Sequence, residues 1–441
     1  MNSLQDTTLK SNKKIKINFN GGELSSDGGL LLFKEFMNKM GVERLIKEKF
    51  KTTDSAHRRE HKDDSNLLQV IYQVIGAYFT DDSADELRHD PIFTAILEKD
   101  ALASQPTLSR FYNRMDGDTL AQFNEIIRGL RRKIYILKKP QMVLLDLDSA
   151  LLETYGQQEG EGFNFHYRAH GYHPLLCYDG LTGDLLKVQL RNGTDYSSNG
   201  VVEFLQPLLD EFLEEYPDTQ LFSRGDSGFA TPGLYTQFET NGVSYAIRLK
   251  ENKVLRKHAS ELVGELETIT RDNIMEYAVV YGEFYYQADS WEYPRRVVCK
   301  VEKPQDQLCM MITYIVTNMD LCPEQIIAYY RNRGRMENFI KESKNGFDFG
   351  AVSSSSEVVN ANRLQAHALI YNLFNWFRRL VLPAEMRRNL VDTIRLKLIK
   401  IAARIVHSGR YIYFKLCSNC PYKDAFYKTL DNIWGLQPQL E

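Results

Sequence analysis

Between residues 26 and 132 the apolar positions recur with the spacing of amphipathic helices. The run NLLQVIYQVIGAYF is apolar enough for a core helix, and Ser65 precedes it as a candidate N-cap. Asp27 stands in the same position before GGLLLFKEFMNKMG. A further helix is expected after Ser104, because Pro106 then falls in its first turn, where proline is favoured. The N-terminal part of the chain is therefore predicted to be helical.

After Pro140 the helical spacing gives way to short apolar runs. MVLLDLDSALL has the pattern of a buried strand, and two further strands are expected around HPLLCYDGLTGDLLKVQLR, where Asp179-Gly180 and Thr182-Gly183 signal a turn. VVEFLQPLLDEFLEEYP is amphipathic, TQLFSRGDSGF is strand-like, GLYTQFETNG is helical and VSYAIRLK is again strand-like. Three strands, helix, strand, helix and strand is an order typical of an α/β domain.

The second half of the chain is predicted to add strands and then helices. Several strands are expected in MEYAVVYGEFYYQADSWEYPRRVVCKVE and LCMMITYIVTN. A long helix is expected from about Pro323 to Lys344, followed by helices to about Arg404 and a final strand at RYIYFKL. We therefore expect four regions: a helical DNA-binding or dimerisation region (1–139), the first part of the α/β domain (140–250), a β-rich insertion (251–320), and the domain's completion with basic C-terminal helices (321–441).

Composition limits the class of protein. The 441 residues are 43% hydrophobic and 26% charged, which suits a globular protein of two or three folding units. No apolar run is long enough to span a membrane and no secretory signal is evident, so we expect a cytoplasmic protein. Six cysteines do not suggest a disulfide framework, and the lone pair Cys417 and Cys420 offers too few ligands for a structural zinc site.

The net charge of −3 does not by itself indicate a nucleic-acid partner, but affinity for DNA depends on local basic surface. One stretch near the C-terminus contains only two acidic residues but nine cations: Arg378, Arg379, Arg387, Arg388, Arg395, Lys397, Lys400, Arg404 and Arg410. A second basic stretch spans Arg128 to Lys139. Each stretch suits either a solvated helix face or a DNA-contacting surface. The helix expected after Ser104 carries Arg110 and suits either packing in a helical bundle or entry into a DNA groove.

Several carboxylates fall where strands are predicted to end. Asp146 and Asp148 are two residues apart, so both point to one face of an extended strand. Asp226 follows the next core strand, and ligand sites of α/β sheets lie at such carboxyl ends. Magnesium prefers oxygen ligands, and paired metal ions are a common device for attacking phosphodiesters. Each aspartate taken alone is equally consistent with a turn or a cap.

The late helix carries an unusual polar stripe. If it is continuous, five residues fall within an arc of roughly 80°: Tyr330, Arg333, Glu337, Lys341 and Lys344. A helix normally places apolar residues on such a stripe. The stripe suits either a functional face or an exposed salt-bridged one, since Glu337 and Lys341 are an ordinary i,i+4 pair.

The spacing Tyr-x2-Arg-x3-Glu-x6-Lys of Tyr330, Arg333, Glu337 and Lys344 resembles the signature of DDE transposases of bacterial insertion sequences. LDLDSALLETYGQQ and SRGDSGF resemble the segments that hold the first and second aspartate of that family. SSDGGLLL, LRHDPIF and SQPTLSRF resemble blocks of one subfamily, so the resemblance covers most of the chain. It implies an α/β, ribonuclease-H-like mixed sheet with a β-rich insertion between the second aspartate and the glutamate.

The resemblance also implies the site. Asp148, Asp226 and Glu337 would bind two Mg²⁺ ions, with Mn²⁺ as a substitute. Asp148 is preferred because the family places its first aspartate before a small hydroxyl residue, here Ser149. Asp146 is the fallback, because the position after that serine departs from the threonine of many members.

The expected partners follow from the same resemblance. Tyr330, Arg333 and Lys344 would contact the phosphates of transposon ends, with Lys341 and Arg110 as further DNA contacts. The partners would be double-stranded DNA, both terminal inverted repeats and target, and a second copy of the chain on that DNA. We expect a cut-and-paste reaction in the bacterial nucleoid. No G-x-x-x-x-G-K-[ST] motif indicates a nucleotide cofactor.

Two other functions fit parts of the sequence. LLDLDSA is close to the first motif of haloacid-dehalogenase-like phosphatases, with Asp146 as nucleophile and Asp148 as general acid. A catalytically inactive, transposase-derived DNA-binding protein is the non-enzymatic alternative. Trp291 suits either packing in the inserted strands or stacking on an unpaired base, and the histidines around HYRAHGYH suit packing or DNA contact better than zinc.

Overall fold

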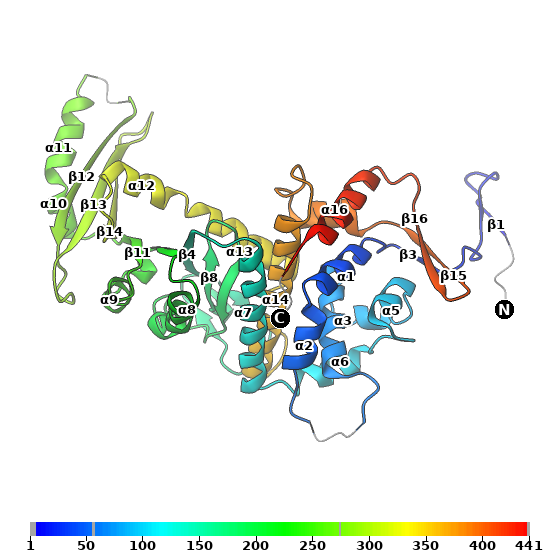
Figure 1. The fold of residues 1–441 in the computed structure, drawn as a ribbon. Coiled ribbons are helices and arrows are strands. Elements are labelled where there is room, and N and C mark those ends of the chain that lie inside the picture. The colour runs from blue at the N-terminus through cyan, green and yellow to red at the C-terminus, as the bar shows by residue number, and fades with distance from the viewer. Residues whose placement is uncertain (1–5, 55–57, 273–274, 439–441) are drawn as a thin grey trace. The chain divides into compact units, whose positions relative to one another are not determined.

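The computed structural model of the chain describes residues 6–54, 58–272 and 275–438 (Figure 1). These residues form two compact units, each collected from distant parts of the sequence. The helical unit comprises Met1–Lys138, Glu342–Phe349 and Gln365–Glu441. The sheet unit comprises Lys139–Lys341 and Gly350–Leu364. Within the described residues, no helix is both long and apolar enough to cross a membrane.

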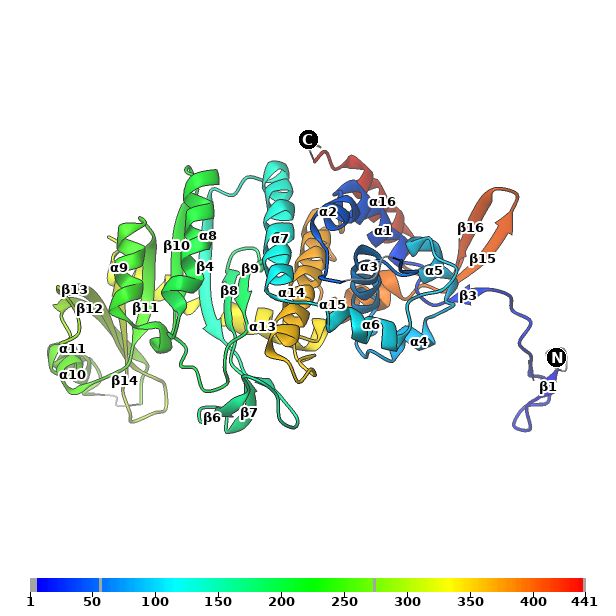
Figure 2. The same ribbon diagram turned by 90° about the horizontal axis from the view of Figure 1, so that it is seen from below.

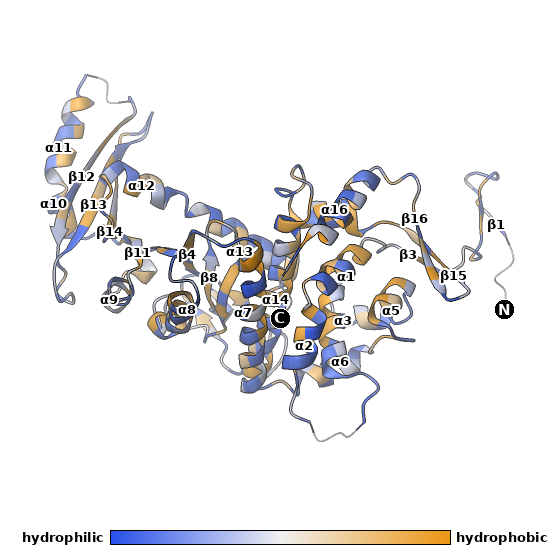
Figure 3. Ribbon diagram, viewed as in Figure 1, coloured by the Kyte–Doolittle hydropathy of each residue, from blue (hydrophilic) through white to orange (hydrophobic). Residues whose placement is uncertain are grey.

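The predicted N-terminal helices are confirmed. Apolar and polar residues alternate along their ribbons, as amphipathic helices require (Figure 3). The helices are α1 (Leu30–Lys39), α2 (Val42–Lys49), α3 (Asp63–Ile75), α4 (Ser83–Glu86), α5 (Pro91–Leu97), α6 (Gln105–Tyr112) and α7 (Gly117–Leu137). Short strands β1 (Thr7–Thr8) and β2 (Lys16–Ile17) precede them.

The predicted N-caps are largely wrong. Ser104 is the N-cap residue of α6 but makes no side-chain capping bond, and Ser65 lies inside α3. Asp27 does not cap α1, because its buried carboxylate is used over a longer range: it accepts bonds from the Tyr78 hydroxyl at 2.8 Å and from Lys400 Nζ at 2.7 Å. A local capping signal has been overridden by tertiary partners.

The C-terminal part of the helical unit differs from the prediction of helices to about Arg404 and a closing strand. The run of helices before the predicted strand ends with α15 (Val391–Ile394) and the π-helical turn η2 (Arg395–Ile399). A hairpin follows, made of β15 (Ala403–Ser408) and β16 (Tyr411–Leu416), and β15 also pairs with β3 (Leu24–Ser25). The chain then closes with a helix, α16 (Lys423–Gly435).

The sheet unit is built on the predicted order of strands and helices, which is confirmed. Its central elements are β4 (Met142–Ser149), β8 (Leu175–Asp179), β9 (Leu185–Gln189), α8 (Val201–Glu215), β10 (Gln220–Gly225), α9 (Pro232–Thr240) and β11 (Ser244–Leu249). In space these strands run β9-β8-β4-β10-β11. The β4, β10 and β11 strands are parallel, while β8 is antiparallel to both β4 and β9. Figure 2 shows α8 and α9 alongside these strands.

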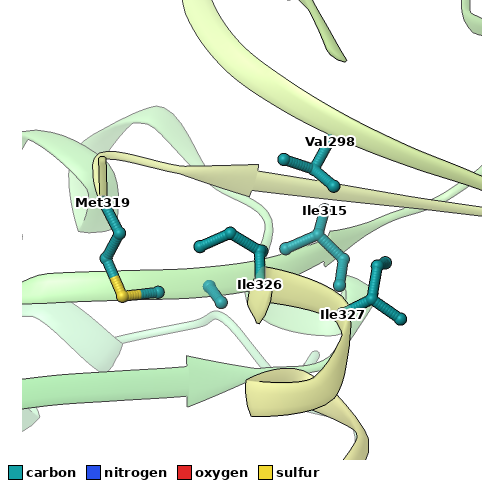
Figure 4. Packing of buried hydrophobic residues seen from close by; sticks show 6 residues of the cluster. Val298, Ile315, Met319, Ile326 and Ile327 are labelled. Carbon is teal, nitrogen blue, oxygen red and sulfur yellow. The ribbon is translucent and has the colours of Figure 1, made fainter. Parts of the chain in front are cut away.

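The strands predicted between residues 251 and 320 are present, and they extend the central sheet. They are β12 (Ala278–Tyr286), β13 (Arg295–Lys303) and β14 (Met311–Thr317), preceded by α10 (Lys253–His258) and α11 (Ser260–Ile269). The β14 strand pairs antiparallel with β11, so all eight strands form one hydrogen-bonded sheet. A buried cluster fixes α12 (Pro323–Arg331) to this part of the sheet (Figure 4): Ala246, Val298, Ile315, Met319, Ile326 and Ile327.

Two features of the sheet unit were not predicted. A small three-stranded sheet lies between β4 and β8 in sequence, formed by β5 (Leu152–Glu153), β6 (Gly162–Asn164) and β7 (Ala169–Tyr172). The predicted single helix from Pro323 to Lys344 is two helices, α12 and α13 (Gly334–Phe347), separated by a turn at Asn332 and Arg333. The final long helix is α14 (Glu357–Leu380).

Candidate active site

Asp146 and Asp148 both lie on β4, the strand between β8 and β10, and their environments differ. Asp146 is fully buried and accepts two bonds from the Arg224 guanidinium, at 2.7 Å from Nε and 2.6 Å from Nη2. Arg224 Nη1 donates to the Tyr329 carbonyl oxygen at 2.8 Å. A Cβ on Gly180 would lie only 2.2 Å from Asp146 Oδ2. Through Arg224, Asp146 therefore links β4 to β10 and α12, and its carboxylate is inaccessible to a substrate.

This placement argues against the phosphatase alternative, which needs Asp146 as an accessible nucleophile. Asp148 lies two residues further along β4, and 17% of its side-chain surface is exposed. Its Oδ1 accepts the Ser149 backbone N–H at 2.9 Å. Of the two aspartates, only Asp148 has an accessible carboxylate.

Asp226 follows β10 directly, and β10 is parallel to β4, so the two carboxylates belong to the same edge of the sheet. Asp226 is partly buried and accepts the Gly228 backbone N–H at 2.8 Å, as the N-cap of the short 3-10 turn Ser227–Phe229. The capping interpretation of this residue is therefore correct. Its Oδ2 takes no part in the cap, because only Oδ1 accepts that bond.

The stripe predicted for the late helix is wrong, because the turn at Asn332 and Arg333 shifts the phase between α12 and α13. Arg333 N–H bonds to the Tyr330 carbonyl oxygen at 2.9 Å, a three-residue step in place of the helical four-residue step. The residues at the turn favour this break: asparagine and glycine are both weak helix formers, and Gly334 opens α13. Glu337 consequently sits exposed in the first turn of α13.

Arg333 joins this turn to β4. Its Nη2 lies 3.0 Å from Asp148 Oδ2 and donates to the Leu147 carbonyl oxygen at 3.1 Å. The two side chains are mostly buried, at 13% exposed for Arg333 and 17% for Asp148. Among the residues that the structure describes, Arg333 Nε is buried without a hydrogen-bond partner. The guanidinium thus neutralises Asp148 while one of its donors stays unused.

The pKa of Asp148 responds to the charges of the other two predicted metal ligands, Asp226 and Glu337. Burial raises the pKa of Asp148 to about 6, although the neighbouring Arg333 lowers it. The negative charges of Asp226 and Glu337 contribute to this raised pKa. The three residues predicted as metal ligands therefore share one electrostatic environment.

Two tyrosines border the carboxylates. Burial raises the pKa of Tyr330, against a lowering by Arg333, and the charge of Asp226 raises it again. Tyr167 was not predicted: burial and the charges of Asp148 and Asp226 raise its pKa, and its hydroxyl donates to the Ser149 carbonyl oxygen at 3.4 Å. Tyr167 follows the small strand β6, and no spacing in the sequence links it to the aspartates.

The donor chemistry suits Mg²⁺, which prefers carboxylate oxygens. In this arrangement, however, the part of the chain that the structure describes contains no group of three His, Cys, Asp or Glu side chains placed to hold a metal ion. The cation beside Asp148 is the Arg333 guanidinium. The residue types fit the metal, and the arrangement places an arginine at one of the three predicted ligands.

The other predicted DNA contacts are exposed. Lys341 lies on α13 in the sheet unit. Lys344 and Arg110 belong to the helical unit, on α13 and α6. Arg110 Nη2 donates to Thr107 Oγ1 at 3.3 Å. The structure therefore gathers Tyr330 and Arg333 with the aspartates within one unit.

The remaining candidates from the sequence are an aromatic residue, a histidine and a cysteine pair. Trp291 is 7% exposed and packs edge-on against Tyr235 and Tyr286, at ring-centroid distances of 5.2 and 5.3 Å, as the packing interpretation predicts. His173 is buried with Nδ1 2.8 Å from the Asp195 carbonyl oxygen. Cys417 and Cys420 are both free thiols.

Comparison with known proteins gives a family match and a likeness to solved structures. Residues 7–438 match a family model described as "Transposase DDE domain group 1". No curated protein sequence matches the chain. The chain is also similar to a piggyBac transposase, in a cryo-EM structure of its synaptic complex with hairpin DNA. The TM-score is 0.40 and the identity 13%, over 90% of this chain and 82% of that one. At that TM-score the likeness carries no argument, so the assignment rests on the family match.

Proposed function

This chain belongs to the family of transposases with a group 1 DDE domain, and on that premise we propose that it cleaves DNA at transposon ends and joins the freed 3′-hydroxyl to target DNA. The observation that carries the proposal is the placement of Asp148 and Asp226 at the carboxyl ends of the neighbouring parallel strands β4 and β10. The negative charges of Asp226 and Glu337 act on Asp148 there, and Arg333 forms an ion pair with it. The proposal assigns these three carboxylates to catalysis, as the family resemblance implies.

The proposed fold of the catalytic part is ribonuclease-H-like. It is supported by the central five strands, in the spatial order β9-β8-β4-β10-β11, with α8 and α9 between the parallel strands in sequence. Strands β12 to β14 fall between Asp226 and Glu337 in the sequence, which is where the family resemblance implies an insertion.

Asp148, Asp226 and Glu337 would hold Mg²⁺, with Mn²⁺ as a substitute, through their carboxylate oxygens. Metal ions held there would activate a water molecule and stabilise the oxygen that leaves the scissile phosphate. To free Asp148 for that role, Arg333 has to exchange its 3.0 Å ion pair for another anion. A DNA phosphate is a suitable one, because phosphate oxygens accept charge-assisted bonds from a guanidinium.

The protein side chains would orient the DNA. Arg333 and Tyr330 border the carboxylates and can donate to phosphate oxygens, which fixes the register of the DNA without reading its sequence. Lys341, Lys344 and Arg110 are exposed cations and are proposed as further phosphate contacts. We propose that two copies of the chain act together, because two transposon ends must be joined. The element is proposed to be a bacterial insertion sequence with inverted terminal repeats.

The test is a cleavage assay on a labelled duplex that carries the inverted repeat flanking the gene. Wild-type protein should nick the duplex at the repeat end when Mg²⁺ or Mn²⁺ is added, and chelation should stop the reaction. Glu337→Gln should bind the duplex with unchanged affinity and leave it uncut. Glu324→Gln is the matched control, since Glu324 is an exposed glutamate in the first turn of α12.

Two outcomes would overturn the assignment. Cleavage by Glu337→Gln at the wild-type rate would remove Glu337 from the site. Binding of the repeat without metal-dependent cleavage by the wild type would instead identify the protein as an inactive, transposase-derived DNA-binding protein.

A further inference from the structure

Much of the basic stretch near the C-terminus is used inside the helical unit. Arg378 forms a 2.8 Å ion pair with Glu342, and its side chain is only 13% exposed. Arg395 is 3% exposed and donates to the backbone of α3, and Lys400 pairs with the buried Asp27 at 2.7 Å. These three cations stabilise the fold. The stretch as a whole therefore does not form the DNA surface that its composition suggested.

The β15–β16 hairpin has the opposite character. Residues 403–416 contain Arg404, Arg410, Lys415 and His407, and no aspartate or glutamate. The first three are exposed and, within the described residues, form no ion pair. His407 is also exposed and lies 3.6 Å from Glu23. In a chain of net charge −3, the hairpin is a concentrated patch of uncompensated positive charge.

The strand register sorts these residues onto one face. Arg404 lies opposite Lys415, and two positions along, Val406 lies opposite Tyr413. Residues opposite one another in an antiparallel pair share a face, as do residues two apart on one strand. Tyr411 therefore joins the same face, which we call the ribbon face: Arg404, Val406, Ser408, Tyr411, Tyr413 and Lys415.

The tip of the hairpin is compact and stays exposed. Its turn consists of Gly409 and Arg410, and glycine is required at the first position because its φ is +60°. The Arg410 guanidinium lies 5.7 Å from the centre of the Tyr411 ring. Tyr411 and Tyr413 are 59% and 48% exposed, with their rings 6.3 Å apart. Two aromatic rings and an arginine thus occupy the end of the ribbon.

The other face anchors the hairpin. Ala403 and Ile405 are buried, and they alternate with the exposed Arg404 along β15. The β15 strand also pairs with β3, so β16 is the edge of the three-stranded sheet. The ribbon face is consequently presented by a strand pair that is fixed to the unit along one side.

We propose that the ribbon face, with Arg410 at its tip, binds double-stranded DNA. This inference rests on the proposed function, which makes DNA the substrate. Three exposed cations that form no ion pair within the described residues complement phosphates, and a two-stranded ribbon has the width that the major groove of B-DNA admits. The tyrosine hydroxyls are available to bond sugar and phosphate oxygens. The ribbon supplies affinity to DNA in general, since phosphate contacts carry no sequence information.

A second copy of this chain is the competing occupant, because β16 is an unpaired sheet edge. Charge argues against it, since pairing two such edges would bring two patches of uncompensated positive charge together. Binding of DNA and pairing with a second copy predict different effects of a substitution on the affinity for DNA and on the mass of the protein in solution.

The test uses the full chain and a fluorescein-labelled duplex of mixed sequence, with binding followed by anisotropy over a range of salt concentrations. The variant Arg404→Ala/Arg410→Ala/Lys415→Ala should bind at least about 10-fold more weakly, and its slope of log K against log salt should fall by about 2 to 3, as expected for the loss of three phosphate contacts. Lys253→Ala/Lys257→Ala/Arg271→Ala is the matched control, which removes three exposed cations elsewhere. The control should stay close to wild type.

A second variant separates charge from folding. Arg404→Lys/Arg410→Lys keeps the charge and should bind as the wild type does, and thermal unfolding should show all variants folded. Equal losses in the ribbon and control variants, or no loss in the ribbon variant, would overturn the proposal. A ribbon variant with unchanged affinity but half the mass in solution would show a contact between copies instead. Failure of either kind leaves metal-dependent nicking by the wild type intact, so it is distinguishable from failure of the proposed function.

Discussion

Arg333 and Asp148 form an ion pair of 3.0 Å that connects the turn between two helices to the central strand of the sheet. Arg333 belongs to the turn that separates α12 from α13, so the pair links the break between the two helices to β4. It also occupies one of the three carboxylates assigned to the metal. Arg333 therefore has two roles in the proposed reaction: it neutralises Asp148 before DNA binds, and it contacts a phosphate afterwards.

Replacing Arg333 should weaken the binding of transposon ends. Arg333→Ala removes a partly buried donor and leaves Asp148 without its cation. We expect end affinity to fall by about 10-fold, with a smaller salt dependence. Anisotropy with a labelled repeat measures both quantities. Arg335→Ala, two residues away and exposed, is the control. Equal effects of the two substitutions would contradict a special role for Arg333.

Replacing Asp148 should abolish cleavage and remove one source of the pH dependence of folding stability. The folded-state pKa of Asp148 is raised to about 6 from 3.8. The protonated form is thus favoured on folding, and the stability it contributes is lost as pH rises from about 4 through about 6. Asp148→Asn cannot titrate, so the stability of the variant relative to the wild type should rise by up to about 3 kcal/mol between about pH 4 and pH 7, starting from the cost of losing the Arg333 ion pair. Urea unfolding at several pH values tests this. A pH-independent difference would contradict the cause given.

Breaking the Asp146–Arg224 pair should be destabilising. Both side chains are buried, and removal of one leaves the other as an uncompensated charge. Arg224→Met should lower the free energy of unfolding by about 3–5 kcal/mol, and Asp146→Asn/Arg224→Met should lower it less. Denaturant titration of the two variants gives the comparison. A double variant no more stable than Arg224→Met would contradict the pairing.

Gly180 should not tolerate alanine. The added Cβ would lie 2.2 Å from Asp146 Oδ2 and 2.9 Å from Arg224 Nη2, and both atoms belong to a fixed buried pair. Gly180→Ala should therefore cost at least about 2 kcal/mol through overpacking. Gly117→Ala is the control, because a Cβ there meets nothing within 4 Å and alanine favours the helix. Thermal unfolding should separate the two, and equal melting temperatures would contradict the clash.

Periodicity predicted the central sheet because its strands and helices are long enough to show a pattern. The run MVLLDLDSALL contains β4 whole, and Asp226 was correctly placed at the end of a strand. The strands of the small sheet are only two to four residues long, which is too short to show an alternation of apolar and polar residues. Tyr167 was missed with them.

The break before Glu337 could not be predicted from spacing. A helical-wheel calculation assumes that the local backbone continues, whereas here Arg333 bonds to Asp148 and Leu147, nearly 190 residues away in sequence. The cap expected at Asp27 failed for the same kind of reason, since Lys400 and Tyr78 take its carboxylate. Both errors arose where a polar side chain had a distant partner.

The continuity of β14 with β11 has a mechanical consequence. An appended domain on a linker can swing, but strands that share one hydrogen-bond ladder cannot move independently. Five strand spacings separate β12 from β4 in the sheet order, which amounts to about 24 Å at about 4.8 Å per spacing. That span matches about seven base pairs of duplex DNA at about 3.4 Å each. The separation between the outer strand β12 and the strand that carries Asp148 is therefore set by the hydrogen-bonded sheet itself.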